Sequence, residues 1–332
     1  MRAQLVRSAT ARMTASRVTS WQLLHGVPIL LLAALPLMIG NTFYLHLAVL
    51  ICLNAIFVLG LSIIARVGQL SFCHGAFIGI GAYAAVLAER SVALPFLAGV
   101  VIAAGVAGLL AATLGWIILR LRGVYFVLVT FAFGELVRLL LLDFPSVSGG
   151  ANGITDIPVV TLLGVPLDTK AEFYVFALIV LVATLSLTAA LLRSPIGRAF
   201  GAIEENLALA RGVGISARHF QILAFTLGST IAAAAGVLLA HYIGYISPES
   251  FGMQLSVNLI IMLVVGGRKS LIGPLLGALF LTPLPELLRN TLQLQYILFG
   301  AVLILVLRFL PGGLGGLVDR WGVRPASRAG KV

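Results

Sequence analysis

The chain has 332 residues, of which 60% are hydrophobic and only 10% charged, and its formal net charge is +11. Since a soluble domain carries about 25% charged residues, this composition excludes an ordinary soluble globular protein and indicates an integral membrane protein. The two cysteines, Cys52 and Cys73, lie in apolar runs with no cluster of His or Asp near them. They therefore predict neither a zinc site nor a disulfide framework.

The first 22 residues are basic, with four arginines spaced five residues apart from Arg2 to Arg17 and no acidic residue. This composition resembles a transit peptide, but the spacing does not gather the arginines on one helical face. The apolar run that follows, Val27 to Ile39, has no small-residue cleavage site behind it. We therefore expect residues 1–22 to be an uncleaved cytoplasmic arm that precedes a signal anchor.

A helix needs about 20 apolar residues to cross the hydrocarbon core of a bilayer. The segments that qualify are about 23–39, 43–65, 70–88, 92–119, 123–142, 172–192, 219–243 and 292–309, and two further segments, 254–265 and 271–289, are short or broken. The pattern predicts an all-α integral membrane protein with about ten membrane segments, some of them discontinuous. The transmembrane domain would cover residues 23–318, and a basic tail would cover 319–332.

A loop over residues 143–171 is rich in Gly, Pro and Asp and divides the predicted spans into two halves of five. Its glycines between Gly149 and Gly153 are typical of tight turns, because glycine tolerates positive φ. In the second half, the small residues Gly228, Ala232 and Gly236 recur every four positions, which predicts close helix packing.

The positions of the basic residues predict the orientation. If the N-terminus is cytoplasmic, 18 of the 22 Lys and Arg residues lie inside, and only Arg90, Lys170 and Arg289 lie outside. Because Lys and Arg in short loops favour the cytoplasm, we expect both termini inside and the 143–171 loop outside. The net charge of +11 then reflects topology, and we expect no nucleic-acid partner.

Polar and small residues interrupt two apolar segments in corresponding halves of the chain. They are Gln69, Ser71, His74, Gly75 and Gly79 in the first half, and Ser270, Gly273 and Gly277 in the second. Interrupted segments in matching positions indicate the translocation path of a transporter, because unwound backbone needs protein or water around it. Close packing of helices at GxxxG faces explains the same glycines equally well.

Two pairs of opposite charges occur in apolar segments at a spacing of three residues: Glu135 with Arg138, and Glu286 with Arg289. Each pair can neutralise itself along one helix face, which favours a structural role over contact with a substrate. His74 has no acidic residue within a helical turn, so a neutral hydrogen-bonding role is favoured over proton transfer.

Residues 193–218 are the longest hydrophilic interruption of the apolar body. The stretch opens with the helix breaker Ser194-Pro195-Ile196-Gly197, continues as a short run that permits a helix, and stops at Gly212-Val213-Gly214. A compact basic loop of this kind between membrane spans predicts a surface on which another protein docks.

The loop, with its Gly-Arg-Ala, Ala-Ile-x-Glu and closing Gly-Ile patterns, resembles the coupling loop of ABC-importer permeases, in particular the M-type permease of branched-chain amino acid importers. Further motifs in the order of that family are Gly68-Gln69-Leu70-Ser71, Leu121-Arg122-Gly123-Val124-Tyr125-Phe126, Phe133-Gly134-Glu135, Gly149-Gly150 with Asn152-Gly153, and Ile246-Ser247-Pro248-Glu249-Ser250-Phe251-Gly252. The resemblance covers most of the chain past residue 42. It departs from the family pattern at Glu204, where an Arg is usual, and at Asn206, where an acid is usual.

The resemblance implies the fold of an ABC-importer permease in the bacterial inner membrane, working by alternating access. It implies three kinds of partner besides membrane lipid: a second related permease, two ABC ATPase subunits and an external substrate-binding protein. It assigns coupling to the ATPase to Gly197, Arg198, Ile203, Glu204, Glu205, Gly212 and Gly214.

The sequence contains no phosphate loop, since Gly266-Gly267-Arg268-Lys269-Ser270 lacks the required glycine before the lysine. We therefore expect the chain to bind no cofactor or metal, to be no enzyme and to take its energy from ATP hydrolysed by its partners. Two alternatives remain at this stage: a secondary transporter driven by an ion gradient, with Glu135 as its titrating acid, and a permease of the same superfamily for urea or short-chain amides.

Overall fold

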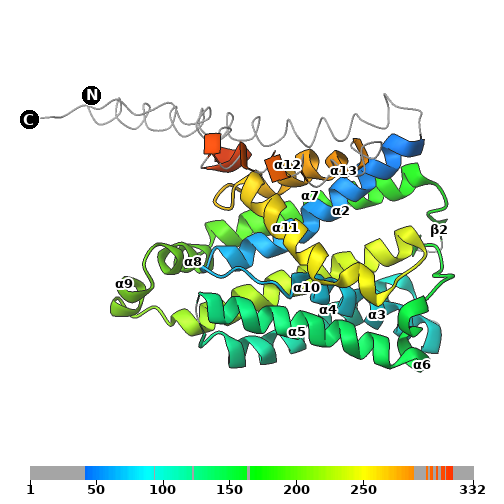
Figure 1. The fold of residues 1–332 in the computed structure, drawn as a ribbon, viewed down its shortest axis with the longest axis horizontal. Helices are drawn as coiled ribbons and strands as arrows, with labels where there is room; N and C mark the ends of the chain where they lie inside the picture. Colours follow the sequence, from blue (N-terminus) through cyan, green and yellow to red (C-terminus); the bar gives the residue numbers. More distant parts are fainter. Residues whose placement is uncertain are drawn as a thin grey trace, which may run out of the picture.

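The computed structural model describes residues 42–92, 94–121, 123–162 and 165–287, together with parts of 297–316. In these residues the protein is mostly helical (Figure 1). The elements in chain order are α2 (Thr42–Ala65), α3 (His74–Val92), α4 (Phe96–Ile118), α5 (Val124–Asp143), α6 (Pro145–Ser148), η1 (Gly150–Asn152), β1 (Thr161–Leu162), β2 (Val165–Pro166), α7 (Lys170–Arg193), α8 (Pro195–Glu205), α9 (Leu207–Gly212), α10 (Ala217–Ile243), η2 (Pro248–Phe251), α11 (Met253–Gly266), α12 (Gly273–Leu281) and α13 (Pro283–Leu287).

Seven helical segments in the described residues are long and apolar enough to cross a membrane, with η2 and α11 counted as one. Six of them (α2, α3, α4, α5, α7 and α10) fall on predicted spans to within four residues at either end. The short predicted segment 254–265 is α11, and the broken one, 271–289, begins as α12 and α13, which Thr282 separates. The predicted span 23–39 lies wholly, and the span 292–309 largely, outside the described residues; the N-terminal arm 1–22 and the tail 319–332 lie wholly outside them.

The helix of the third predicted span begins at His74 rather than at residue 70. The chain between Ala65 and His74 is irregular, and Gly68 within it has φ +77°, which favours glycine. Gln69 and Ser71 therefore lie in a buried connection that precedes α3, not within the helix.

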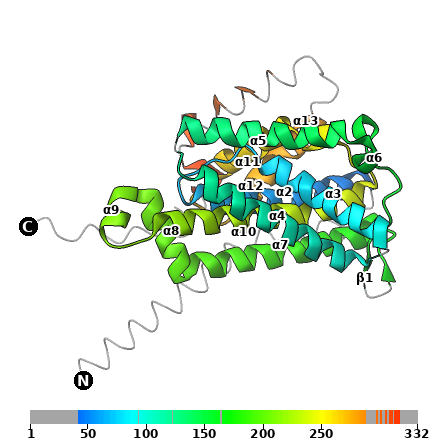
Figure 2. The ribbon, with the colours of Figure 1, turned by 90° about the horizontal axis from the view of Figure 1, so that it is seen from below.

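The helix α2 lies at the centre of the bundle. Of its most apolar 18-residue window, 83% is buried inside the protein, compared with 56% for α3 and α10 and only 11% for α5. The two views agree on this arrangement, with α5 along one edge (Figures 1 and 2). Six large apolar side chains of α5 are exposed, among them Leu128, Leu136 and Leu140, and α5 presents them to lipid or to another subunit.

Small residues allow α10 to approach α2 closely. A Cβ atom added at Gly60 would lie 2.6 Å from the carbonyl oxygen of Gly228, and one added at Gly228 would lie 2.5 Å from that of Gly60. Gly236 similarly packs against the backbone of Ile78 in α3. The close packing predicted from the repeating small residues of α10 is therefore confirmed.

The polar segments gather at opposite ends of the bundle: α8 and α9 project from one end, and α6, β1 and β2 lie at the other (Figures 1 and 2). At the second end, β1 pairs antiparallel with β2, and an antiparallel bridge between Ile154 and Ile246 ties the loop to the residues after α10. The glycine turns predicted there are present, since Gly149 and Gly153 have φ +77° and +69°.

Candidate functional site

The helices α8 and α9 are defined by their capping residues. Ser194 Oγ accepts hydrogen bonds from the backbone N–H groups of Ile196 and Gly197, with Pro195 in the first turn of α8. Asn206 Oδ1 accepts two more from Ala208 and Leu209, each at 3.0 Å, and so begins α9. The predicted single run is therefore two helices. The second ends at Gly212, and Gly214, with φ +87°, turns the chain toward α10.

One face of α8 is buried and the other is free. Phe200 and Ile203 pack with Ile63 and Val67 near the end of α2 and with Ala224 of α10. Ile203, which the resemblance placed in the coupling set, is only 3% exposed and anchors α8 to the bundle.

The opposite face of the α8–α9 unit carries exposed Arg198 and Glu205. Two large apolar side chains accompany them, Leu209 and Val213, which are 66% and 70% exposed. Apolar side chains exposed on a polar loop are typical of a docking surface.

Two contacts connect α8 and α2 with the turn between α11 and α12. Arg268 Nη2 donates a hydrogen bond to Glu204 Oε1 at 2.9 Å, and the Glu204 side chain is only 11% exposed. Arg66, just after α2, donates from Nη2 to the backbone oxygen of Lys269 at 2.8 Å. Glu204 thus points toward the bundle, and Gly197 packs against the backbone of Leu192 at the end of α7.

The first interrupted segment forms a tight contact between α3 and the η2–α11 region. The Gly75 N–H donates to Ser256 Oγ at 2.9 Å, and a Cβ atom at Gly79 would lie 2.8 Å from Phe251 Cβ. His74 is fully buried, and its Nε2 donates to the carbonyl oxygen of Phe57 at 2.9 Å, since a carbonyl only accepts.

Gln69 and Ser71 are also buried, and the Ser71 hydroxyl lies 3.1 Å from Cys73 Sγ. The whole first group is therefore packed against protein in this structure.

The second interrupted segment packs α11 against α12. A Cβ atom at Gly273 or Gly277 would overlap backbone oxygen atoms at the end of α11 or just after it. Ser270 is 4% exposed, and its Oγ has no hydrogen-bond partner among the described residues. The two groups contact α11 at different places: Gly75 at Ser256, Gly277 at Met262 and Gly273 at Gly266.

The predicted pair of Glu135 and Arg138 is present and has a third member. Arg138 Nε donates to both carboxylate oxygens of Glu135 at 3.0 and 3.1 Å. Its Nη1 donates to Glu249 Oε1 at 2.5 Å, which joins α5 to η2. The side chain of Glu286 and all of Arg289 lie outside the described residues.

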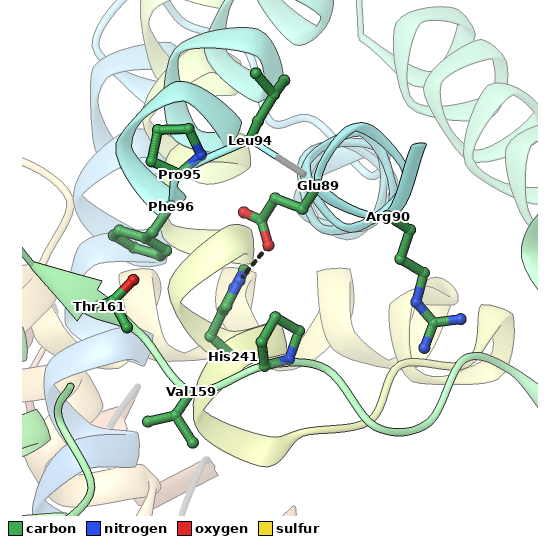
Figure 3. Close-up of a pocket in the computed structure, with 9 residues that line it drawn as sticks. Glu89, Arg90, Leu94, Pro95, Phe96, Val159, Thr161 and His241 are labelled. Carbon is green, nitrogen blue, oxygen red and sulfur yellow. Dashed lines mark hydrogen bonds and ion pairs between the residues drawn. The ribbon is translucent and has the colours of Figure 1, made fainter. Parts of the chain in front are cut away.

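A buried polar pair lies beside a cavity of about 270 Å³ at the end of α3 (Figure 3). Glu89 Oε2 and His241 Nε2 are 2.8 Å apart, and their side chains are 7% and 1% exposed. The apolar wall includes Pro95 and Phe96. The other carboxylate oxygen, Glu89 Oε1, has no hydrogen-bond partner in the part of the chain described.

Sequence reasoning missed several of these residues. Nothing in the sequence predicted a role for Glu89 or His241, or a partner for Arg268. Glu89 and His241 are 152 positions apart, a separation at which helical periodicity carries no information. Leu209 and Val213 could have been identified from the sequence as candidate docking residues, because they are large apolar residues inside the longest polar stretch.

Comparison with known proteins identifies relatives. Residues 43–307 match the family model described as the permease component of branched-chain amino acid transport systems. The chain is 34% identical to the high-affinity branched-chain amino acid transport system permease protein LivM of Escherichia coli K12, over 88% of this chain and 75% of the relative. It is 35% identical to LivM of Salmonella typhimurium, over 77% and 66%. A shorter match, 34% identical over 42% of the chain and 46% of the relative, is the permease protein LivH of Salmonella typhimurium. No solved structure matches.

Proposed function

Because the chain belongs to the family of branched-chain amino acid transport permease components, we propose that it is the transmembrane permease subunit of an ATP-binding-cassette importer for branched-chain amino acids. The observation that carries the ATP-driven mechanism is the α8–α9 unit, which is anchored on one face and free on the other. In this proposal the unit docks on a separate ATPase at the cytoplasmic face of a bacterial inner membrane.

The free face supports docking by its composition. Arg198 and Glu205 offer charges of both signs, while Leu209 and Val213 offer apolar area that burial on a partner would stabilise. The buried face supports force transfer, because Phe200 and Ile203 fasten α8 to α2 and α10. A displacement of α8 by the ATPase would therefore also displace α2 and α10, to which α8 is packed.

The contacts with the turn after α11 extend this path. Glu204 holds Arg268, and Arg66 holds the backbone at Lys269, so displacement of α8 pulls on the turn between α11 and α12. That turn precedes the closely packed Gly273 and Gly277. We propose that sliding at these glycines, and at Gly75 and Gly79 of α3, opens and closes the path in alternation.

The relatives' names suggest the substrate and one partner, a second permease. A second permease of the same family, as the LivH similarity suggests, would complete the path, and two ATPase subunits and an external binding protein would complete the importer. This chain would itself bind no ATP and catalyse no reaction. A path lined by Gly, Ser, Gln and apolar side chains would hold a zwitterion weakly, as translocation requires.

The source of energy tests the proposal. In cells that express the whole importer, uptake of radiolabelled leucine is expected to continue when an uncoupler collapses the proton gradient and ATP is maintained. It is expected to stop when the phosphate-loop lysine of the partner ATPase is replaced by alanine. Unlabelled isoleucine and valine should compete, whereas urea and acetamide should not.

Two results would contradict the proposal. Uptake that follows the proton gradient and ignores the ATPase substitution would identify a secondary transporter. ATP-dependent uptake of labelled urea or acetamide, with no uptake of leucine, would retain the ATP-driven mechanism but assign another substrate.

A further inference from the structure

Two arginines from distant parts of the chain lie over one tryptophan ring. The guanidinium carbons of Arg120, just after α4, and of Arg218, in the first turn of α10, are each 5.4 Å from the centroid of Trp116. Arg218 Nη2 also donates a hydrogen bond to the backbone oxygen of Trp116 at 2.7 Å. The ring and the hydrogen bond therefore place both guanidinium groups beside Trp116.

Neither charge is neutralised within the described chain. The described carboxylates that form ion pairs do so with Arg138, His241 or Arg268, and none of them contacts Arg120 or Arg218. The Arg218 Nε atom is buried without a hydrogen-bond partner among the described residues. Two helix ends meet here: the uncapped start of α10 brings a partial positive charge, and the end of α4, whose Trp116 carbonyl accepts from Arg218, brings a partial negative one.

The surface beside the two arginines is apolar. Trp116 and Ile117 are 58% and 61% exposed, and Leu109, two helical turns earlier on α4, is 69% exposed. A spanning helix with exposed large apolar side chains borders acyl chains, and tryptophan favours the level of the lipid head groups. The apolar stripe thus ends at two cations that have no carboxylate partner in the described chain, beside a tryptophan of the kind that marks the level of the head groups.

We propose that Arg120, Arg218 and Trp116 bind the head group of an anionic phospholipid, with its phosphate at the guanidinium groups beside Trp116 and an acyl chain along Leu109 and Ile117 of α4. Guanidinium groups bind phosphate oxygens through charge-assisted hydrogen bonds, and basic sites between spanning helices attract anionic head groups. The site lies in the leaflet on the side of α8 and α9, since α10 starts shortly after α9 ends. A bound lipid would bridge the end of α4 and the start of α10.

The fluorescence of Trp116 provides a direct test. The chain has three tryptophans, so the full-length protein with Trp21→Phe and Trp321→Phe retains only Trp116. In nanodiscs, phosphatidylglycerol with brominated acyl chains is expected to quench Trp116 at lower mole fraction than phosphatidylcholine with the same chains. Each guanidinium should contribute roughly fivefold to this preference.

Substitution of the arginines makes the test specific. Arg120→Gln alone, at an exposed position, should reduce the preference for phosphatidylglycerol about fivefold, and Arg120→Gln with Arg218→Gln should abolish it. Arg211→Gln, which removes an exposed charge on α9 away from Trp116, should leave it unchanged. Equal quenching by the two lipids would overturn the proposal. So would a preference for phosphatidylglycerol that is the same in the Arg120→Gln and Arg211→Gln variants.

Discussion

Glu89 and His241 share one proton, and the backbone determines where the other imidazole proton lies. His241 Nδ1 is 2.8 Å from the carbonyl oxygen of Val237, which only accepts, so Nδ1 carries a hydrogen. One further proton must then lie between Nε2 and Glu89 Oε2, whether the pair is ionic or neutral. In both states the pair has no net charge, which explains how it is tolerated at a buried position.

Removing one partner should destabilise the protein. In Glu89→Ala, His241 Nε2 loses its partner, and we expect the free energy of unfolding to fall by about 1–3 kcal/mol. Glu89→Gln should retain most of the stability, because its amide can donate to neutral Nε2. Thermal unfolding in detergent would measure both, with Glu205→Ala as an exposed control. An unfolding temperature for Glu89→Ala equal to that of this control would show that the pair contributes nothing.

For contacts between single residues, the sequence predicted pairs that are close along the chain but not pairs that are far apart along it. The spacing of three residues predicted that Arg138 binds Glu135, which the structure confirms. The contact of Arg138 with Glu249 joins positions 111 residues apart and depends on how η2 packs against α5. No local pattern encodes such a contact.

Among the elements, the strongest prediction concerns the contact between α2 and α10. Gly228→Ala places a methyl group 2.5 Å from the backbone oxygen of Gly60, so the helices must separate, at roughly 1–3 kcal/mol. The matched control is Gly105→Ala on α4, where nothing lies within 4 Å of the added Cβ. That substitution should be neutral or stabilise the helix by about 0.5–1 kcal/mol.

Unfolding temperatures of the two alanine variants, followed by intrinsic fluorescence in detergent, would provide the comparison. We expect a fall of several degrees for Gly228→Ala and none for Gly105→Ala. Equal unfolding temperatures would mean that α2 and α10 can separate without loss of stability. The close contact at Gly60 and Gly228 would then not be what holds α10 in place.

Apolar length was enough to predict most helices, whereas their ends depended on side-chain chemistry. The predicted span 123–142 is α5 almost residue for residue. The start of α3 was misplaced because the turn at Gly68 has apolar neighbours, which a count of hydrophobic residues includes in the span. The break between α8 and α9 was missed because it depends on one cap, Asn206.

For the molecule as a whole, the proposed coupling depends on Glu204 and Arg268. Both side chains are accessible to water to some degree, so their ion pair should stabilise the fold by no more than about 1 kcal/mol. Its effect on transport should be larger if it transmits movement from α8. A variant that loses transport but keeps its stability would show that the ion pair acts in coupling and not only in folding.

Charge exchange tests this distinction. Glu204→Arg alone and Arg268→Glu alone should each reduce leucine uptake by the assembled importer roughly three- to tenfold, with little change in unfolding temperature. The double variant, which restores the pair in reverse, should recover most of the uptake. If the double variant transports as poorly as either single one, the contact does not act as a link.

The central position of α2 has a consequence for how the protein is made. Asn54 of α2 donates a hydrogen bond from Nδ2 to Thr282 Oγ1 at 3.0 Å, and the groove at Gly60 receives Gly228. Both partners belong to the second half of the chain, so these contacts of α2 cannot form while the ribosome has still to complete that half. During that interval its amide has no Thr282 to bind, a costly state in hydrocarbon. The helix that ends up most enclosed is therefore among the earliest to be synthesised and the last to be surrounded.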